Sequence, residues 1–248
     1  MFDLKTIQDG LKNDEFFLEY LPIVSLDNEC CVGAEALLRW RRPAGVVLPD
    51  EFIPLVENTP LSGLLTYWVI DQVAIELVDW LRHQDGVELH INVPPEILGR
   101  GGLEYAAQKS GLSEVRHKIV LEITERGLPD QIGLQALDNA VRQGIRIALD
   151  DVRIDPASVM VLSRCNAQII KIDKSVLSGS EGKGSMPRWA EALAALLKTT
   201  DLEVIAEGVE TAEQVAMLRA VGVQKVQGYY FSPPMQVEAF LHYFTLHG

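Results

Sequence analysis

Short apolar runs alternate with stretches of helical periodicity along the whole chain. In the longest helical stretch, after Thr59-Pro60, apolar residues recur at helical spacing and predict a core-facing stripe: Leu61, Leu64, Leu65, Trp68 and Val69. Eight runs have the length and composition of strands, at 16–26, 31–39, 87–93, 118–123, 145–150, 168–172, 203–207 and 225–227. Further helices are expected after Asp3, after Pro49, at 129–142, around 189–197, after a capping box at 211–214 and near 236–246.

The connections between these elements are short, and no repeat or change of composition divides the chain. Alternating strands and helices predict an α/β fold with a parallel sheet and helices outside it. At 248 residues, one TIM-like (β/α)8 barrel spanning 1–248 is favoured over an open sheet. Pro22 favours an edge or irregular position for the first strand, and the Gly/Ser-rich segment 179–185 is expected to be a mobile loop.

Composition and charge narrow the class of protein. Hydrophobic residues make up 48% of the chain, which is enough for a sizeable core. The net charge of −13 argues against a nucleic-acid polymer or an anionic membrane surface as a partner. We expect no signal peptide and no membrane-spanning segment. The three cysteines fit neither a disulfide framework nor a zinc spacing, which suits a cytoplasmic protein.

Polar side chains stand at the ends of most of the predicted strands. The strand 145–150 ends in Asp150, and because side chains alternate along a strand, Asp150 shares a face with Ala148. Seven residues occupy or adjoin such ends: Glu35, Asn92, Glu122, Asp150, Lys171, Glu207 and Gln227. A polar strand cap explains any one of them but hardly all seven, and barrel enzymes carry their chemistry at the carboxyl ends of the strands. His90 is interpreted instead as a hydrogen-bonded interior residue.

The residue types at these ends indicate metal chemistry with oxygen ligands. Magnesium or manganese is favoured over zinc, because the set contains no cysteine and no convincing histidine. Adjacent Asp150 and Asp151 could hold two cations, and two such ions stabilise the attacking and leaving oxygens of a phosphoryl displacement. Lys171 could orient the attacking water, and Glu207 could hold a metal or take a proton from that water.

The run Gly33–Trp40, which contains Glu35-Ala36-Leu37, resembles the signature of the EAL domain family, whose members hydrolyse cyclic di-GMP to the linear dinucleotide pGpG. Further ordered motifs extend the resemblance over nearly the whole chain: Pro22–Val24, Phe52–Pro54, Leu121–Glu125, Ala148–Asp151, Lys171–Asp173, Ala206–Thr211 and Gln227–Tyr229. It implies a barrel whose first strand is antiparallel to the rest, two bound magnesium or manganese ions, inhibition by calcium, and a homodimer.

The resemblance also implies a role for individual residues. One metal would be held by Glu35, Asn92, Glu122 and Asp150, and the other by Asp150 and Asp151, with Glu207 also near the metals. Lys171 and Glu207 would act on the water, and Glu35 belongs with them to the catalytic set. The substrate would be seated by Arg39, Leu38, Gln227, Asp173 and Pro233. Glu125 would support the loop that follows Asp151.

Two departures from the family pattern affect the expected activity. The family usually has Asp-Phe-Gly-Thr-Gly after the first aspartate of the pair, whereas this chain has Val152-Arg153-Ile154-Asp155 after Asp151 and so lacks both glycines. Leu21 stands where the family usually has a glutamine that reaches the nucleotide. The altered loop predicts a reduced rate, and the loss of the glutamine is expected to weaken binding more than it harms catalysis. The alternatives are a catalytically weak or inactive cyclic di-GMP receptor, a protein-interaction module, or a barrel enzyme acting on another phosphodiester.

Overall fold

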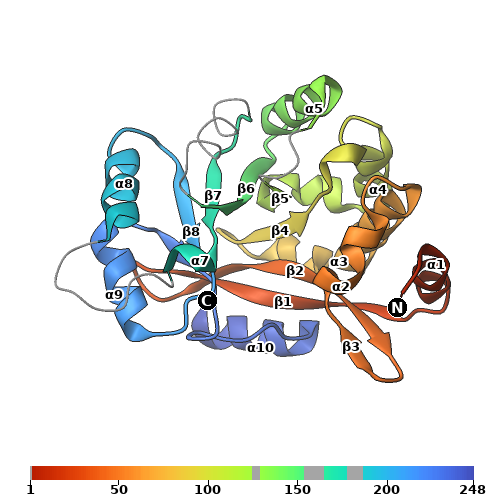
Figure 1. Cartoon of the computed structure of the whole chain (residues 1–248), viewed down its shortest axis with the longest axis horizontal. Helices are drawn as coiled ribbons and strands as arrows, with labels where there is room; N and C mark the ends of the chain where they lie inside the picture. Colours follow the sequence, from red (N-terminus) through yellow and green to blue (C-terminus); the bar gives the residue numbers. More distant parts are fainter. Residues whose placement is uncertain (1, 125–128, 154–164, 178–186) are drawn as a thin grey trace.

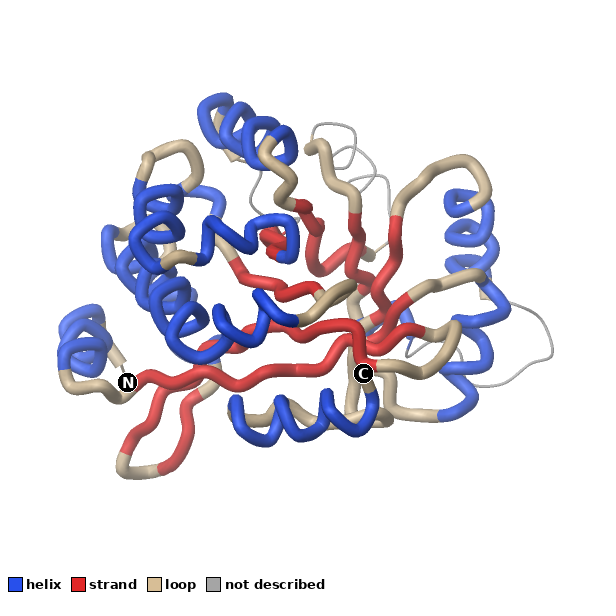
Figure 2. The backbone as a smooth tube through the Cα atoms, turned by 180° about the vertical axis from the view of Figure 1, so that it is seen from behind, coloured by secondary structure: helices blue, strands red, loops and turns tan. Residues whose placement is uncertain are grey.

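The computed structural model describes residues 2–124, 129–153, 165–177 and 187–248. Eight strands close into a barrel with helices around it (Figures 1 and 2), as the sequence predicts. The barrel strands are β1 (Phe16–Ser25), β2 (Cys31–Arg42), β4 (Glu88–Asn92), β5 (Ile119–Thr124), β6 (Arg146–Val152), β7 (Ile169–Ile172), β8 (Glu203–Ala206) and β9 (Lys225–Val226). From β2 round to β9, neighbouring strands are parallel.

Strand β1 closes the barrel by pairing antiparallel with both β2 and β9, which confirms the expectation of an inverted first strand. Its pairing with β9 is short and involves only Val24 and Ser25. On this side of β1, Tyr20 pairs with Met235 and Val24 pairs with β9. Pro22 lies between these two residues and has no strand partner on that side. The missing N–H of the proline costs no sheet hydrogen bond at this position.

Helices cover the outside of the barrel, and α10 lies along β1 (Figure 1). Their bounds are α1 (Leu4–Lys12), α2 (Pro49–Val56), α3 (Pro60–His83), α4 (Gly102–Ser110), α5 (Gln131–Arg142), α7 (Lys174–Leu177), α8 (Arg188–Leu197), α9 (Ala212–Val221) and α10 (Val237–His247). Two short 3-10 segments, η1 (Pro95–Ile97) and η2 (Leu112–Lys118), join the covering layer. The caps follow the sequence: Asp3 accepts from the Thr6 N–H, and Thr211 forms the expected capping box with Gln214.

Three features of the outer layer differ from the prediction. The short strand β3 (Gly45–Val47), which pairs antiparallel with β2, and helix α4 were not expected. On α3, Leu61, Leu65 and Val69 are buried, but Leu64 is 47% exposed, because the buried face of the helix is rotated away from Leu64 and toward Ser62 and Thr66. By length and composition α3 could pass for a membrane-spanning helix, but 56% of its apolar window is buried against the rest of the molecule, as in a core helix.

Inside the barrel, an apolar layer separates two polar levels. Inward-facing Ile23, Val120, Ala148, Ile169 and Ile205 form this layer. The alternate residues of the same strands, such as Ile147 and Leu149, face outward and pack against the helices. The predicted alternation in the strand 145–150 is therefore correct, and each inward position two residues beyond the apolar layer faces the carboxyl end of the barrel.

Candidate active site

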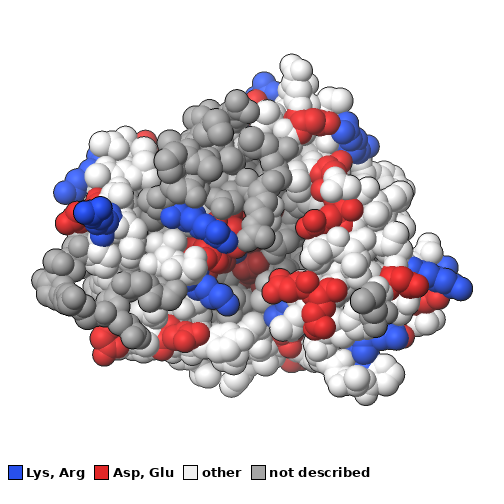
Figure 3. Space-filling model, in the orientation of Figure 1, with Lys and Arg blue, Asp and Glu red and all other residues white. Residues whose placement is uncertain are grey.

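The polar level at the carboxyl end is built by strand alternation. Glu122, Asp150, Lys171 and Glu207 each follow a residue of the apolar layer by two positions, so they face the barrel axis on four successive strands. Acidic side chains gather in the hollow at the centre of the face shown in Figure 3. The sequence had assigned these residues to strand ends one by one, and closure of the barrel brings them together.

Lys171 lies at the centre of this level and is fully buried. Its Nζ lies 2.7 Å from Glu207 Oε1, 2.8 Å from Glu35 Oε2, 2.9 Å from Glu122 Oε2 and 3.4 Å from Asp150 Oδ1. One ammonium therefore faces four carboxylates from four other strands. Such a group is stable only because the cation and the anions compensate one another in the same enclosed space.

Glu35 is the best satisfied of these carboxylates. Its Oε1 accepts from Asn92 Nδ2 at 2.8 Å, and its Oε2 accepts from Lys171 and from Gln227 Nε2 at 3.1 Å. The backbone at Gly228 helps to place Gln227, because a Cβ at residue 228 would lie 2.2 Å from the carbonyl oxygen of Val209. Glycine is required there, since φ is +155°.

The carboxylates titrate very differently from one another. Burial alone would raise the pKa of Glu35, but the charge of Lys171 and the hydrogen bonds from Lys171, Asn92 and Gln227 hold it at about 2. Burial and the charge of Glu35 raise the pKa of Glu122 to about 7. Burial likewise raises the pKa of Asp150 and of Glu207. One lysine is thus too little to keep all of these acids ionised without metal ions, and three of them have a raised pKa.

Asp150, Asp151 and Glu207 each offer one carboxylate oxygen, and these three atoms lie within 4.8 Å of one another. Pairing of β6 with β7 shifts register between Leu149 and Val152, and Asp151 has φ +59°. This bulge breaks the strand alternation and allows adjacent aspartates to serve one site. Oδ1 of Asp150 is buried without a hydrogen-bond partner. Clustered carboxylate oxygens of this kind fit a divalent cation that prefers oxygen ligands.

The residues predicted to bind the substrate do not all face the carboxylates around Lys171. Arg39 points inward on β2, and its Nε donates to Glu19 Oε2 at 2.7 Å. Asp173 accepts from the Ser175 N–H, Pro233 is exposed, and Leu38 faces outward against the core beneath the helices, away from the carboxylates. Glu125 lies outside the described residues, as do the segment 179–185 and most of the loop after Arg153.

A second polar level, at the amino end of the parallel strands, was not predicted. Arg146 donates to Glu88 at 2.9 Å and to Glu203 at 3.0 Å, and Lys225 donates to the same two carboxylates at 2.7 and 2.9 Å. We call these four residues the floor network. Each lies two or four positions before a residue of the carboxyl-end level, so strand alternation could have placed each one on the inward face, although not which of them pair.

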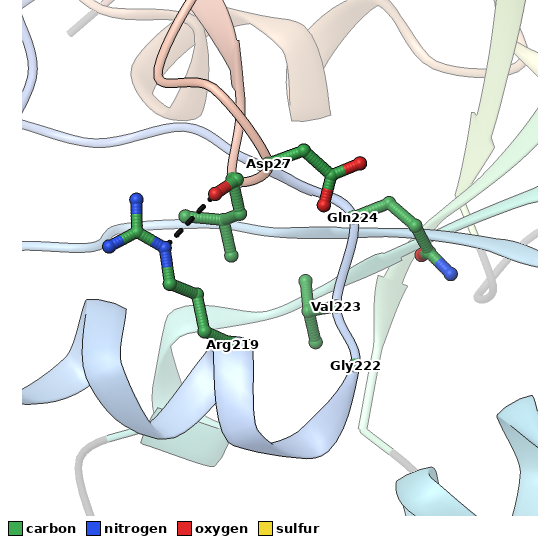
Figure 4. Close-up of a pocket in the computed structure, with 6 residues that line it drawn as sticks. Asp27, Arg219, Gly222, Val223 and Gln224 are labelled. Carbon is green, nitrogen blue, oxygen red and sulfur yellow. Dashed lines mark hydrogen bonds between the residues drawn. The ribbon is translucent and has the colours of Figure 1, made fainter.

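A separate hollow of about 520 Å³ lies outside the barrel near its floor (Figure 4). It is lined by Leu26, Asp27, Arg219, Gly222, Val223 and Gln224. Arg219 closes one side, since its Nε donates to the Leu26 carbonyl at 3.0 Å. The hollow contains none of the inward carboxylates, so the candidate chemistry lies at the opposite end of the molecule.

Comparisons with known proteins agree with this geometry. Residues 4–234 match the family model of the EAL domain. The probable cyclic di-GMP phosphodiesterase PdeB of Escherichia coli is 34% identical over 97% of this chain and 47% of its own length. The cyclic di-GMP phosphodiesterase PdeL of the same organism is 31% identical over 96% of this chain and 67% of its own length.

Solved structures show the same fold. The EAL enzyme Bd1971, in a form with cAMP and cyclic di-GMP bound, superposes with a TM-score of 0.84 at 30% identity, covering 97% of this chain and 67% of that one. The PaMucR phosphodiesterase in complex with c-di-GMP superposes with a TM-score of 0.83 at 27% identity, covering 96% of this chain and 98% of that one. This chain spans about half the length of several curated relatives, as the 47% for PdeB illustrates.

Proposed function

This chain belongs to the EAL domain family, and we propose that it hydrolyses cyclic di-GMP to linear pGpG in a metal-dependent reaction. The observation that carries the proposal is the ring of oxygen ligands around Lys171 at the carboxyl end of the barrel. Relatives named as cyclic di-GMP phosphodiesterases support the choice of substrate. The proposal takes residues 1–248 as one EAL-type domain.

The residues present fit two divalent cations, magnesium or manganese. Bound there, the cations would supply Lewis-acid activation of water and of the phosphodiester. Glu35, Asn92, Glu122 and Asp150 would hold one ion, and Asp150, Asp151 and Glu207 would hold the other. Asp150 is suited to serve both, because its Oδ1 lacks a hydrogen-bond partner.

Lys171 and Glu207 are proposed to act on the attacking water. Their charged atoms lie 2.7 Å apart, so one water could contact both. Lys171 would orient it and steady the negative charge that develops on the phosphate, and Glu207 would accept its proton. Glu35 would hold Lys171 in place through the 2.8 Å contact while it binds a metal.

Arg39, Gln227, Asp173 and Pro233 are proposed to seat the dinucleotide. Arg39 supplies positive charge for a phosphate, which matters in a chain whose net charge is −13. Leu38 would contribute through the position of the β2 backbone, since its side chain faces the outer core. A homodimer and a cytoplasmic location complete the proposal; the three cysteines are free, which suits a reducing compartment.

The deciding experiment incubates pure protein with cyclic di-GMP and magnesium or manganese, and follows pGpG by chromatography. Cyclic di-AMP serves as the control substrate, and a parallel incubation with calcium tests the expected inhibition. Production of pGpG from cyclic di-GMP alone supports the proposal, at a reduced rate if the altered loop after Asp151 limits it. Tight binding of cyclic di-GMP in calorimetry without product in either metal favours the receptor alternative.

A further inference from the structure

The guanidinium of Arg39 is fixed from one side by an acidic residue of the neighbouring strand. Its Nε donates to Glu19 Oε2 at 2.7 Å, and its NH1 donates to the Leu38 carbonyl at 3.2 Å. Arg39 is only 8% exposed. Two of the three guanidinium nitrogens are therefore held, and the buried side chain has little freedom to adopt another rotamer.

The register between β1 and β2 explains the contact. Glu19 pairs with Leu37, and Leu21 pairs with Glu35, so these residues alternate along the inward face that also carries Arg39. Arg39 is thus a diagonal neighbour of Glu19 and lies two inward positions beyond Glu35. That separation is about 13 Å along the strand, at roughly 3.3 Å per residue.

Glu19 is the only acidic side chain within ion-pair distance of Arg39 among the residues that the structure describes. The carboxylates around Lys171 lie on the same inward side, but none of them forms an ion pair with Arg39. Without Glu19, the guanidinium would therefore lose its ion-pair partner and could turn to other rotamers. Glu19 thus holds the cation at the rim of the site.

From these contacts we propose that Glu19 is a positioning residue, which holds Arg39 in the orientation that binds a phosphate of the dinucleotide. The inference rests on the proposed function. An arginine grips a phosphate through a planar fork, so its orientation must be fixed, and fixing it in advance lowers the entropic cost of binding. The charge of Glu19 itself opposes the phosphate, so its benefit comes from geometry.

This separation of geometry from charge gives opposite expectations for two variants. Glu19→Gln keeps an oxygen that accepts from Arg39 Nε and removes the negative charge, whereas Glu19→Ala removes both. We expect Glu19→Ala to weaken cyclic di-GMP binding roughly five- to tenfold. Glu19→Gln should bind at least as tightly as the unmodified chain. In steady-state assays with magnesium, KM should rise for the alanine variant while kcat stays the same.

The test measures cyclic di-GMP affinity by calorimetry in calcium for both variants. Glu15→Ala is the matched control, because Glu15 forms a similar ion pair with Arg42 at 2.6 Å on the other side of β2 and should leave the affinity unchanged. The Arg39 Nε–H signal in nitrogen-edited NMR gives a readout that needs no substrate. It should be sharp and protected from exchange in the unmodified chain and in Glu19→Gln, and broadened in Glu19→Ala.

Equal affinities for the two Glu19 variants, whether unchanged or both tighter, would overturn the inference, because geometry would then have no effect. A protected Nε–H signal in Glu19→Ala would overturn it as well. If the unmodified chain neither binds nor cleaves cyclic di-GMP, the proposed function fails on its own account. The NMR comparison would then still decide whether Glu19 orders Arg39.

Discussion

Nδ1 of His90 lies 2.6 Å from Oε1 of Glu122, in the fully buried interior of the barrel. On its other side, Nε2 lies 3.1 Å from Glu88 Oε1, within ion-pair distance. One imidazole thus connects a proposed metal ligand to the floor network. Burial would lower the pKa of His90, but the hydrogen bonds and charges of Glu122 and Glu88 raise it to about 9.

Replacing His90 with leucine should destabilise the fold strongly. The change keeps a similar volume but leaves Glu122 and Glu88 without their shared cation, and removing one partner of a buried pair costs about 3–5 kcal/mol. Urea unfolding followed by circular dichroism would measure the loss. His83→Leu is the control, because His83 is exposed on α3 and should change the free energy of unfolding little. A loss below about 1 kcal/mol for His90→Leu would contradict the expected role.

The metal-free protein should be most stable in mildly acidic solution. Burial would raise the pKa of Glu88, but the hydrogen bond and charge of His90 and the charge of Lys225 lower it to about 2. Its stabilisation is complete above the ordinary pKa of about 4.5 and is lost as the pH falls toward 2. The pKa of Glu122, raised to about 7, has the opposite effect: stability falls as the pH rises from about 4.5 through 7.

A plot of the free energy of unfolding against pH should therefore have two limbs, an acid limb from Glu88 and a limb above about pH 4.5 from Glu122. Each limb changes the free energy of unfolding by on the order of 3 kcal/mol over its whole range. Urea unfolding in EDTA from about pH 2.5 to 8 would trace most of the first and all of the second, at low protein concentration because the isoelectric point is about 4.8. Glu88→Gln should flatten the acid limb, and Glu122→Gln should flatten the limb above pH 5. A free energy of unfolding that climbs steadily from pH 5 to 8 would show that the carboxylates do not repel one another as inferred.

Glu35→Ala should abolish hydrolysis and weaken metal binding together. Glu35 joins Asn92, Gln227 and Lys171 at the site, and its loss removes both a proposed ligand and the partner of the lysine. Residues that only support a metal ligand cost 10- to 100-fold when changed, so a direct ligand should cost at least about a hundredfold. Turnover and manganese affinity, measured side by side, check this. Unchanged values for both would remove Glu35 from the ligand set.

Lys171→Ala should lose most turnover, about a hundredfold or more, while cyclic di-GMP affinity in calcium stays nearly the same. The reason is that Lys171 faces the carboxylates and would act on the water, whereas Arg39 would hold the phosphate. Lys225→Ala is the matched control, since Lys225 is also an interior lysine between two carboxylates, but in the floor network. It should lower stability and keep turnover per folded molecule. A large loss of affinity in Lys171→Ala would place Lys171 among the substrate contacts.

Restoring the family loop after Asp151 should raise turnover and tighten the metal dependence. The graft replaces Val152–Asp155 with Phe-Gly-Thr-Gly, with the following residues matched to the family. Because misplacement by about 1 Å can cost roughly a hundredfold in rate, a better-supported Asp151 could gain a comparable factor. Val152 is 1% exposed, so a second graft that keeps Val152 guards against overpacking. If both grafts fold but neither is faster, the present loop works in its own right, and the reduced-rate expectation should be dropped.

Strand alternation was sufficient to predict most of what the site needs. Because side chains alternate along a strand, Asp150 and Glu207 face inward like Ala148 and Ile205, which precede them by two positions. A closed barrel then brings such inward positions together, whatever their separation in the chain. The antiparallel first strand came from the family resemblance, although Pro22 marked that strand as irregular.

Features that depend on which side chains meet across the barrel were not predictable in this way. The floor network requires Arg146 and Lys225 to reach the same two carboxylates, which follows from strand stagger. The exposure of Leu64 depends on which face α3 turns to the barrel, and the buried Ser62 and Thr66 lie on that face although a count of apolar residues does not include them. Strand β3 is too short for its pattern to be detected.

The floor network also has a consequence for the order in which the chain can fold. Glu88 lies on β4 and Glu203 on β8. One of the two cations that neutralise both is Lys225, which belongs to the last strand, β9. Until β9 pairs with its neighbours, these carboxylates lack one of their two cations, and burying them in a partly closed barrel is unfavourable. Synthesis of β9 therefore sets the earliest moment at which a nascent chain can complete its interior, and a product truncated before Lys225 should remain open and accessible to proteases.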